Sequence, residues 1–346
     1  MRPHQIHRAG RSSRMRGFTL IELMIGITIG LIVLLGLVVF FSYNSRNQHD
    51  LERSIVRLEN SRFALDTLTE DLLHAGYYAQ HVPDSGASYN AIVPCPADIL
   101  PADILKLGWS EDATQMPPAV QGLPADPTDA AQSCLTGLRA GTDVITVTHA
   151  ETGDSQTPAS TDVSNLYIQT TSCATDTDRV KVNTGGPAVN FPLKTQECDA
   201  TKPNPVHRLM QRTYFLSDCN NCTSNDGIPS LKRGELIGNS FVVNTVAEGV
   251  EQLQFEYGVD TDSDGQVDEW LAFAGITGAA SYEWRNVVAV RVHMLTRSSQ
   301  RDPGQVEQRT FQMGPLTLEP ADLPAGYRRT LLTTTVPLTN VGSRRE

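Results

Sequence analysis

The sequence predicts an α+β fold in which a long N-terminal helix, apolar in its first half, packs on an antiparallel β-sheet with loop-rich insertions. Three observations lead to this prediction. An uncharged apolar run occupies residues 23–41, a proline-free amphipathic stretch follows it, and segments that alternate apolar and polar residues recur after residue 141. A helix before a series of strands is typical of this class, because the helix can cover one face of the sheet.

Composition and charge limit the classes of function. The chain has 346 residues, of which 40% are hydrophobic and 19% charged, so it can bury a substantial core. Its formal net charge is −11. Five arginines lie within residues 1–17, and without them 23 Lys and Arg face 39 Asp and Glu, a balance of −16. So acidic a body repels nucleic-acid phosphate, and we expect no direct nucleic-acid partner.

The apolar run from Leu23 to Phe41 contains 19 residues without a charge, roughly the length that crosses the hydrocarbon of a bilayer. A cleaved secretory signal is shorter and ends in a small-x-small site, which does not follow Phe41. A plain membrane anchor accounts for the run and for the arginines before it. It does not account for Glu22, because a carboxylate at that depth is costly without a partner.

The segment RGFTLIELMIG, residues 16–26, resembles the class III leader of type IV pilins and of type II secretion pseudopilins. The resemblance implies that a prepilin peptidase cuts between Gly17 and Phe18 and that Phe18 is then N-methylated. Glu22 becomes the fifth residue of the mature chain, and its expected partner is the N-terminal amine of a neighbouring subunit. Opposite charges in apolar surroundings attract strongly when paired, so this contact would set the axial register of the subunits.

Five segments are expected along the chain. They are a leader peptide at 1–17, a transmembrane and assembly half of the helix at 18–43, an amphipathic half at 44–78, a loop-rich insertion at 79–140 and a β-rich globular domain at 141–346. Met1 and Met15 both remain open as translation starts. The amphipathic half carries an apolar stripe that we expect to be buried on the protein's own domain. The stripe consists of Leu51, Ile55, Leu58, Leu65, Leu68 and Leu72.

The insertion is rich in Pro, Gly, Ala and Asp, which favours loops. The domain after it contains segments with the period of two that is typical of an antiparallel sheet with one buried face. The expected strands lie at 142–149, 165–170, 206–217, 241–246, 250–258, 284–297, 306–313 and 327–338.

Several of these segments resemble the PilW-type minor pilins. They are QRTYFLS at 211–217, SLKRGEL at 230–236, VEQLQFEYGVDTDSDGQVDEW at 250–270 and YRRTLLTTTVPLTN at 327–340. Residues 80–205 resemble nothing that we know. The resemblance implies a minor pilin that primes assembly of a type IV pilus, joins its tip complex and supports twitching motility, adhesion or DNA uptake.

The same resemblance implies partners and a location. The implied partners are other minor and major pilins, the prepilin peptidase, the inner-membrane assembly platform, a tip adhesin, and membrane lipid before assembly. The implied location is the inner membrane, with a single span and a periplasmic C-terminal domain, followed by the pilus on the cell surface. Two alternatives stay open: a minor pseudopilin of a type II secretion system, and a membrane-anchored periplasmic binding or adhesion domain that does not polymerise.

The chain contains six cysteines, all after the apolar run, and an even number in an exported region indicates disulfides. They are Cys95, Cys134, Cys173, Cys198, Cys219 and Cys222. Fifteen pairings are conceivable, so the connectivity stays open. Cys95 and Cys134 bracket the insertion and are placed to staple it. Cys219-Asn-Asn-Cys222 lies in a polar loop between strands, which favours a short structural disulfide over a redox pair at a helix N-terminus.

An aspartate-rich loop has the spacing D-x-D-x-D-G-x-x-D. In a Ca²⁺ loop of this spacing Asp260, Asp262, Asp264 and Asp268 would offer carboxylates, and Gln266 would offer its main-chain carbonyl. The twelfth position is Leu271 instead of the bidentate glutamate of an EF-hand, and the flanks are strand-like. A metal-free acidic turn between two strands is the alternative. Four acids within nine residues repel one another, which favours Ca²⁺ as a cofactor.

Catalytic motifs are missing from the sequence. It contains no G-x-S-x-G, no phosphate-binding loop and no dinucleotide fingerprint, and its histidines lack metal-ligand spacing. Zinc binding by four cysteines would need a second close pair, whereas Cys173 and Cys198 are 25 residues apart. We therefore expect no enzyme and, apart from Ca²⁺, no cofactor.

Overall fold

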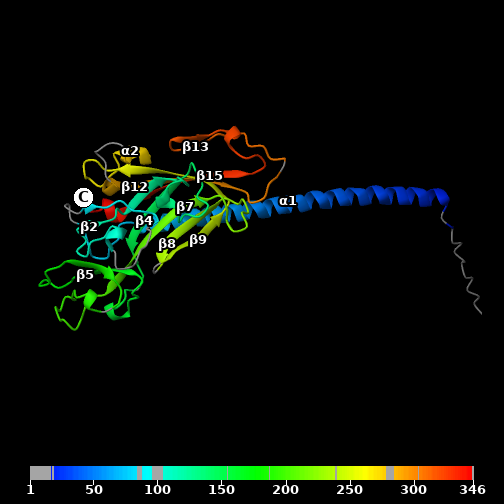
Figure 1. Ribbon diagram of the computed structural model, residues 1–346. Helices are drawn as coiled ribbons and strands as arrows, with labels where there is room; N and C mark the ends of the chain where they lie inside the picture. The colour runs from blue at the N-terminus through cyan, green and yellow to red at the C-terminus, as the bar shows by residue number, and fades with distance from the viewer. Residues whose placement is uncertain are drawn as a thin grey trace, which may run out of the picture. The chain divides into compact units, whose positions relative to one another are not determined.

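The computed structural model describes residues 17, 19–83, 88–95, 104–153, 155–186, 188–237, 240–277, 284–302 and 304–344. Its contacts divide the chain into two compact units, one that ends at Ile55 and one that begins at Val56. A single helix, α1 (Leu20–His74), belongs to both; its first part is dark blue in Figure 1. The expected leader and Phe18 lie outside the described residues, apart from Gly17.

The predicted amphipathic stripe is buried only in its last part. Leu68 and Leu72 are fully buried, whereas Ile55 is 53% exposed and Leu58 is 42% exposed. The side chain of Leu51 lies outside the described residues. The prediction that the whole stripe is buried on the domain is therefore wrong for Ile55 and Leu58. Helical spacing predicts which face is apolar, but it does not predict where along the helix the sheets begin to cover that face.

Helix α1 ends at a glycine in a left-handed conformation. Gly76 has a φ of 74°, and its amide donates to the carbonyl of Thr148 in the sheet at 2.9 Å. A Cβ at this position would lie 2.9 Å from a methyl group of Val341. Glycine is therefore required both for the backbone conformation and for the close approach of the chain's last helix.

The larger sheet has seven strands, of which β4, β7, β8 and β9 run side by side in Figure 1. The strand order is β3-β4-β7-β5-β6, and β8 pairs with both β7 and β9; every one of these pairs is antiparallel. The strands are β3 (Val120–Pro124), β4 (Asp143–Ala150), β5 (Leu166–Thr170), β6 (Val180–Thr184), β7 (Val206–Ser217), β8 (Ser230–Ile237) and β9 (Ser240–Glu248).

The second sheet has four antiparallel strands in the order β11-β10-β12-β15. These are β10 (Val250–Val259), β11 (Glu269–Leu271), β12 (Val287–Arg297) and β15 (Arg329–Pro337). Gly249, with a φ of 79°, turns the chain from β9 of the first sheet into β10 of the second. The two sheets are therefore consecutive along the chain.

Short elements complete the described part of the chain. The strands β1 (Ser88–Tyr89) and β2 (Gln115–Met116) pair in parallel, and β13 (Phe311–Met313) and β14 (Leu316–Leu318) pair antiparallel. The short helices are α2 (Phe273–Thr277), α3 (Thr339–Gly342) and six 3₁₀ turns: η1 (Ile104–Leu107), η2 (Ala130–Gln132), η3 (Pro158–Ser160), η4 (Ala188–Asn190), η5 (Trp284–Asn286) and η6 (Pro320–Asp322).

The main core lies where the second half of α1 meets both sheets. Leu68 and Leu72 of the helix share one buried cluster with Ile145 and Tyr214 of the larger sheet and Phe255 of the smaller sheet. The fold class predicted from the sequence, a long N-terminal helix packed on antiparallel β-structure, is confirmed. The sequence did not indicate that the strands form two separate sheets.

A glycine lets the two sheets approach each other. A Cβ on Gly122 in β3 would lie only 1.8 Å from the hydroxyl oxygen of Tyr257 in β10, so a larger residue would displace this buried tyrosine. Nearby, the carboxylate of Asp143 in β4 accepts a hydrogen bond from the amide of Phe255 at 2.9 Å. The sheets are thus joined by both packing and hydrogen bonding.

The predicted strands agree with the structure where they are long. The expected strand at 206–217 coincides with β7, and those at 142–149 and 250–258 match β4 and β10 within a residue. The strand expected at 306–313 is wrong in length, because only its last three residues form β13. The segment predicted to be a loop-rich insertion contributes β3, which is an edge strand of the larger sheet.

Candidate functional sites

The N-terminal part of α1 has the composition of a membrane span. Residues Leu20–Ser45 have a mean hydropathy of 2.9, and the side chains of this stretch are exposed. By length and composition alone such a helix can cross a bilayer. Exposed leucine, isoleucine and valine side chains over seven turns of helix would be unfavourable in water, so this segment requires lipid or protein around it.

Glu22 lies in the first turn of α1, where it caps the helix. Its carboxylate accepts hydrogen bonds from the amide and the hydroxyl of Thr19, both at 3.1 Å, and its own amide donates to the Thr19 hydroxyl at 3.3 Å. These reciprocal bonds have the pattern of a capping box. The expected partner, the amine of a processed Phe18 in a neighbouring subunit, lies outside the described residues.

The aspartate loop connects β10 to β11. Asp260 is fully buried, and its carboxylate accepts the amides of Ser263 at 2.6 Å and Gly265 at 3.0 Å. Carboxylate oxygens of Asp260, Asp262 and Asp268 lie within 4.8 Å of one another. Three of the four predicted carboxylates are thus brought together, in a group that could hold a hard cation.

Asp264, Gln266 and Asp268 make hydrogen bonds within the loop itself. The carboxylate of Asp264 accepts the amide of Gln266 at 2.8 Å and its side-chain amide at 3.0 Å, and it is not part of the three-carboxylate group. Asp268 accepts two hydrogen bonds from Thr261, and these hold the pKa of the Asp268 carboxyl below its ordinary value. Such internal bonds also suit a metal-free turn, so the geometry is compatible with both interpretations of the loop.

All six cysteines lie in the described part of the chain and all are paired. The disulfides join Cys95 to Cys134, Cys173 to Cys198 and Cys219 to Cys222, so each cysteine pairs with its nearest neighbour in sequence. The first disulfide lies within the predicted insertion, and the third closes the loop between β7 and β8.

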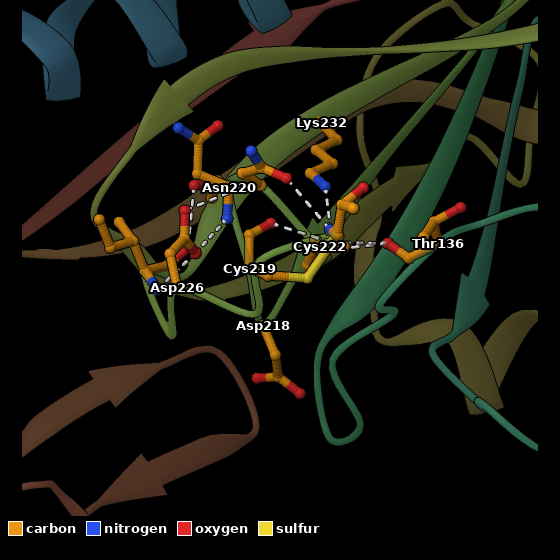
Figure 2. The surroundings of a disulfide bond; sticks show 12 residues. Thr136, Asp218, Cys219, Asn220, Cys222, Asp226 and Lys232 are labelled. Carbon is orange, nitrogen blue, oxygen red and sulfur yellow. Dashed lines mark hydrogen bonds between the residues drawn. A yellow bond between two sulfur atoms is a disulfide. The ribbon is translucent and has the colours of Figure 1, made fainter.

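The surroundings of the Cys219–Cys222 disulfide were not predicted from the sequence. The ammonium of Lys232, in β8, donates to the sulfur of Cys222 at 3.1 Å (Figure 2). The hydroxyl of Ser217, at the end of β7, lies 3.5 Å from the sulfur of Cys219 and 3.4 Å from that of Cys222. The pairing of β7 with β8 brings these residues together.

A pocket of about 430 Å³ also escaped the sequence analysis. It is lined by Tyr78, Tyr89, Trp284 and Arg344, with Ser263 of the aspartate loop at one side. The hydroxyl of Tyr78 is buried without a hydrogen-bond partner among the described residues, and burial raises its pKa well above the ordinary value. The residues that line the pocket are far apart in the sequence, so no local pattern could have revealed the pocket.

Two family models match parts of this chain. The family model described as Type IV Pilus-assembly protein W, PilW, matches residues 213–340, a range that includes the aspartate loop and the Cys219–Cys222 disulfide. The model of the prokaryotic N-terminal methylation motif matches residues 12–38. A search of curated proteins gave no match.

Among solved structures, the chain aligns with a type IV-like pilin from Thermus thermophilus at 11% sequence identity and a TM-score of 0.34. The alignment covers 82% of this chain and 97% of that one. A likeness this low adds no argument. The two family models therefore match different parts of one chain: residues 12–38 carry the prepilin methylation motif, and residues 213–340 are similar to the PilW-type pilin-like proteins.

Proposed function

We propose that the protein is a minor pilin that primes the assembly of a type IV pilus and is incorporated into it, within a complex at the tip. The observation that carries this proposal is the joint presence of the methylation motif at 12–38 and the PilW region at 213–340 in one chain. The first supplies the means of assembly common to pilins. The second supports a minor pilin of the PilW type over a major subunit.

The N-terminal segment would act in three steps. Cleavage between Gly17 and Phe18 exposes a new amine, which is then methylated. The apolar helix is held in the inner membrane, with the domain on the periplasmic side. On assembly, Glu22 pairs with the amine of a neighbouring subunit, and this pairing compensates for the cost of placing both charges in apolar surroundings.

The partners proposed for this function follow from the same steps. The prepilin peptidase and the inner-membrane assembly platform act on the membrane-bound form, and other minor and major pilins pack against the apolar half of the helix. A tip adhesin is the proposed partner of the globular domain. Twitching motility, adhesion and DNA uptake would depend on the pilus that results.

Substitution of Glu22 tests the proposal. We expect Glu22→Ala to be cleaved and membrane-bound but largely absent from sheared pili, measured by immunoblotting of the sheared and membrane fractions. Glu59→Ala is the matched control, because Glu59 is an exposed acid farther along the same helix. Equal amounts of Glu22→Ala and wild-type protein in pili would contradict the assembly mechanism. An intact N-terminus in the mature protein, detected by mass spectrometry, would contradict the pilin assignment itself.

We also propose that the aspartate loop binds Ca²⁺ through Asp260, Asp262 and Asp268, with Asp264 and the Gln266 carbonyl as further ligands after rearrangement. The grouping of three carboxylates supports this. Ca²⁺ at about 100 times its dissociation constant should stabilise the protein by about 3 kcal/mol. Thermal unfolding in Ca²⁺ and in EDTA measures the effect. A response that persists unchanged in Asp262→Asn would refute calcium binding at this loop.

A further inference from the structure

The starting point is the ammonium of Lys232, which is buried against a disulfide. Lys232 is 5% exposed, and within the described part of the chain its hydrogen-bond acceptor is the sulfur of Cys222 at 3.1 Å. Figure 2 shows its side chain directed at the disulfide. Burial lowers the pKa of Lys232, and the more distant charge of Asp226 partly offsets this effect.

A disulfide sulfur is a poor acceptor for a buried ammonium. It is neutral and accepts hydrogen bonds weakly, so the cost of removing the Lys232 charge from water is little compensated. If the disulfide opens, Cys222 can become a thiolate, and the contact becomes a charge-assisted hydrogen bond between opposite charges. The arrangement therefore stabilises the reduced form more than the oxidised form.

The two cysteines of the disulfide differ in exposure. Cys222 is partly exposed, whereas Cys219 is 4% exposed. Gly137 lies over the disulfide with a φ of 69°, and a Cβ there would be 2.7 Å from the sulfur of Cys219 and 3.0 Å from that of Cys222. Any side chain at position 137 would collide with the disulfide, so the glycine lets the backbone pack closely on the sulfur atoms from this side. An external thiolate must therefore approach at the partly exposed Cys222.

The loop is held in place without the disulfide. The carboxylate of Asp226 accepts the amides of Asn220 at 3.0 Å, Asn221 at 2.8 Å and Ile228 at 3.1 Å. The side chain of Asn220 is in turn bonded to Thr245 of β9 at 2.8 Å. Opening the bond between the two sulfur atoms would therefore not release the loop that carries them.

We propose that Cys219–Cys222 is a thiol–disulfide exchange site whose substrate class is an external dithiol or its disulfide, and that Lys232 stabilises Cys222 as a thiolate. This goes beyond the pilin function and does not depend on it. It also replaces the purely structural role expected from the sequence, because the ammonium supplied by β8 takes the place of the missing helix N-terminus.

The exchange proceeds in two nucleophilic displacements at sulfur. A thiolate of the external dithiol attacks the sulfur of Cys222, the bond to Cys219 breaks, and Cys219 leaves with the electron pair beside the Ser217 hydroxyl and takes up a proton. The second thiol of the reagent then loses its proton to solvent and attacks the mixed disulfide, and Cys222 departs as a thiolate next to Lys232. The reagent ends as a disulfide, having given two electrons to the protein.

Within the described part of the chain, few charged side chains lie near the Cys219–Cys222 disulfide. Lys232 approaches from β8 and Asp226 from the loop itself. Asp218, which precedes Cys219, is paired with Arg139 at 2.5 Å, so its charge is largely balanced. Glu248 of β9 accepts a hydrogen bond from the side-chain amide of Asn220. Lys232 is therefore the cation that can act directly on Cys222.

The test is a redox titration of the full-length protein in detergent with dithiothreitol. Samples are quenched with acid, alkylated and analysed by mass spectrometry, so that each of the three disulfides is followed separately. We expect Cys219–Cys222 to open first. In Lys232→Met the equilibrium constant for its reduction should fall about tenfold or more, and Lys232→Arg should restore most of it. Lys181→Met is the matched control, because Lys181 lies in β6 of the same sheet and pairs with Glu111.

A second measurement needs only the wild-type protein. After selective reduction, the rate at which iodoacetamide alkylates Cys222 is followed against pH. We expect a midpoint clearly below the ordinary thiol pKa of about 8.5. A midpoint at or above that value, a Cys219–Cys222 bond that opens no earlier than the others, or a folded Lys232→Met variant with an unchanged equilibrium would each overturn the proposal.

Discussion

Two carboxylates in the domain show how the surroundings of a residue decide whether its charge is stabilising. Burial would raise the pKa of Asp71, but the neighbouring ring of His149 and the charge of Arg212 together lower it below its ordinary value. Burial raises the pKa of Asp143 to about 6, and the hydrogen bond from the amide of Phe255 offsets this only in part. The two residues should therefore respond in opposite directions to removal of their charge.

Asp71 joins α1 to the larger sheet. Its carboxylate accepts hydrogen bonds from Arg212 and from the hydroxyl of Tyr214, both in β7. We expect Asp71→Asn to lower the free energy of unfolding by roughly 3 kcal/mol at pH 7, because Arg212 loses one of its two carboxylate partners and keeps only Glu235. Tyr214→Phe, which removes one hydrogen bond, should cost about 1 kcal/mol. Urea unfolding of both variants measures the difference, and equal losses would argue against an ionic contribution.

The pH dependence of Asp71 follows from the direction of its shift. A carboxyl with a lowered folded-state pKa contributes stability that is complete above its unfolded-state pKa of about 3.8 and is lost as pH falls through the folded value. The difference in stability between wild type and Asp71→Asn should therefore be constant above about pH 5 and shrink below pH 4.

Asp143 should behave in the opposite way. Its folded-state pKa is about 6 against an ordinary value of 3.8, so the domain is destabilised as pH rises from about 4 through 6 and the carboxyl ionises. Asp143→Asn, which keeps an acceptor for Phe255, should raise the free energy of unfolding by about 1–2 kcal/mol at pH 7 and change it little at pH 4. Urea unfolding at the two pH values tests this. A variant less stable than wild type at pH 7 would show that the charge is compensated.

At the scale of elements, features encoded in a contiguous stretch of sequence could be predicted. Features that depend on the pairing of distant strands could not. Strand β7 is a continuous segment of twelve residues, and the bounds predicted from the sequence coincide with the observed ones. Strand β3 lies in a segment rich in proline and glycine, and it forms only because β4 offers an edge to pair with. The aspartate loop is a contiguous motif and was predicted. Lys232 was not, because only the pairing of β7 with β8 brings it to the disulfide.

The disulfides should differ in how much they stabilise these elements. Cys95 and Cys134 are 39 residues apart, whereas Cys219 and Cys222 are three apart. Loop-closure entropy predicts a contribution of about 4 kcal/mol for the first and about 2 kcal/mol for the second. We expect urea unfolding of the double alanine variants to reproduce this order. The reverse order would mean that contacts in the native state, rather than chain entropy, determine the effect.

At the scale of the whole molecule, the two units differ in how much of their apolar surface is buried. The apolar residues of α1 in the first unit remain exposed, and the acidic second unit holds every described disulfide and both sheets. The buried helix residues that complete the core, from Ser61 through Leu72, all belong to the second unit. The buried core of the second unit is therefore formed without residues of the apolar N-terminal segment.

We therefore expect residues 56–346, produced in an oxidising compartment, to fold as a soluble domain with a cooperative thermal transition. A shorter chain, 76–346, should fail to do so, because it lacks Leu68 and Leu72 and leaves the apolar faces of both sheets uncovered. Circular dichroism and thermal melting of the two chains provide the measurement, with mapping of the three disulfides as a check on native pairing. If 76–346 melts like 56–346, the helix does not complete the core. If 56–346 aggregates while the full-length protein in detergent is folded, the first unit contributes to the stability of the second.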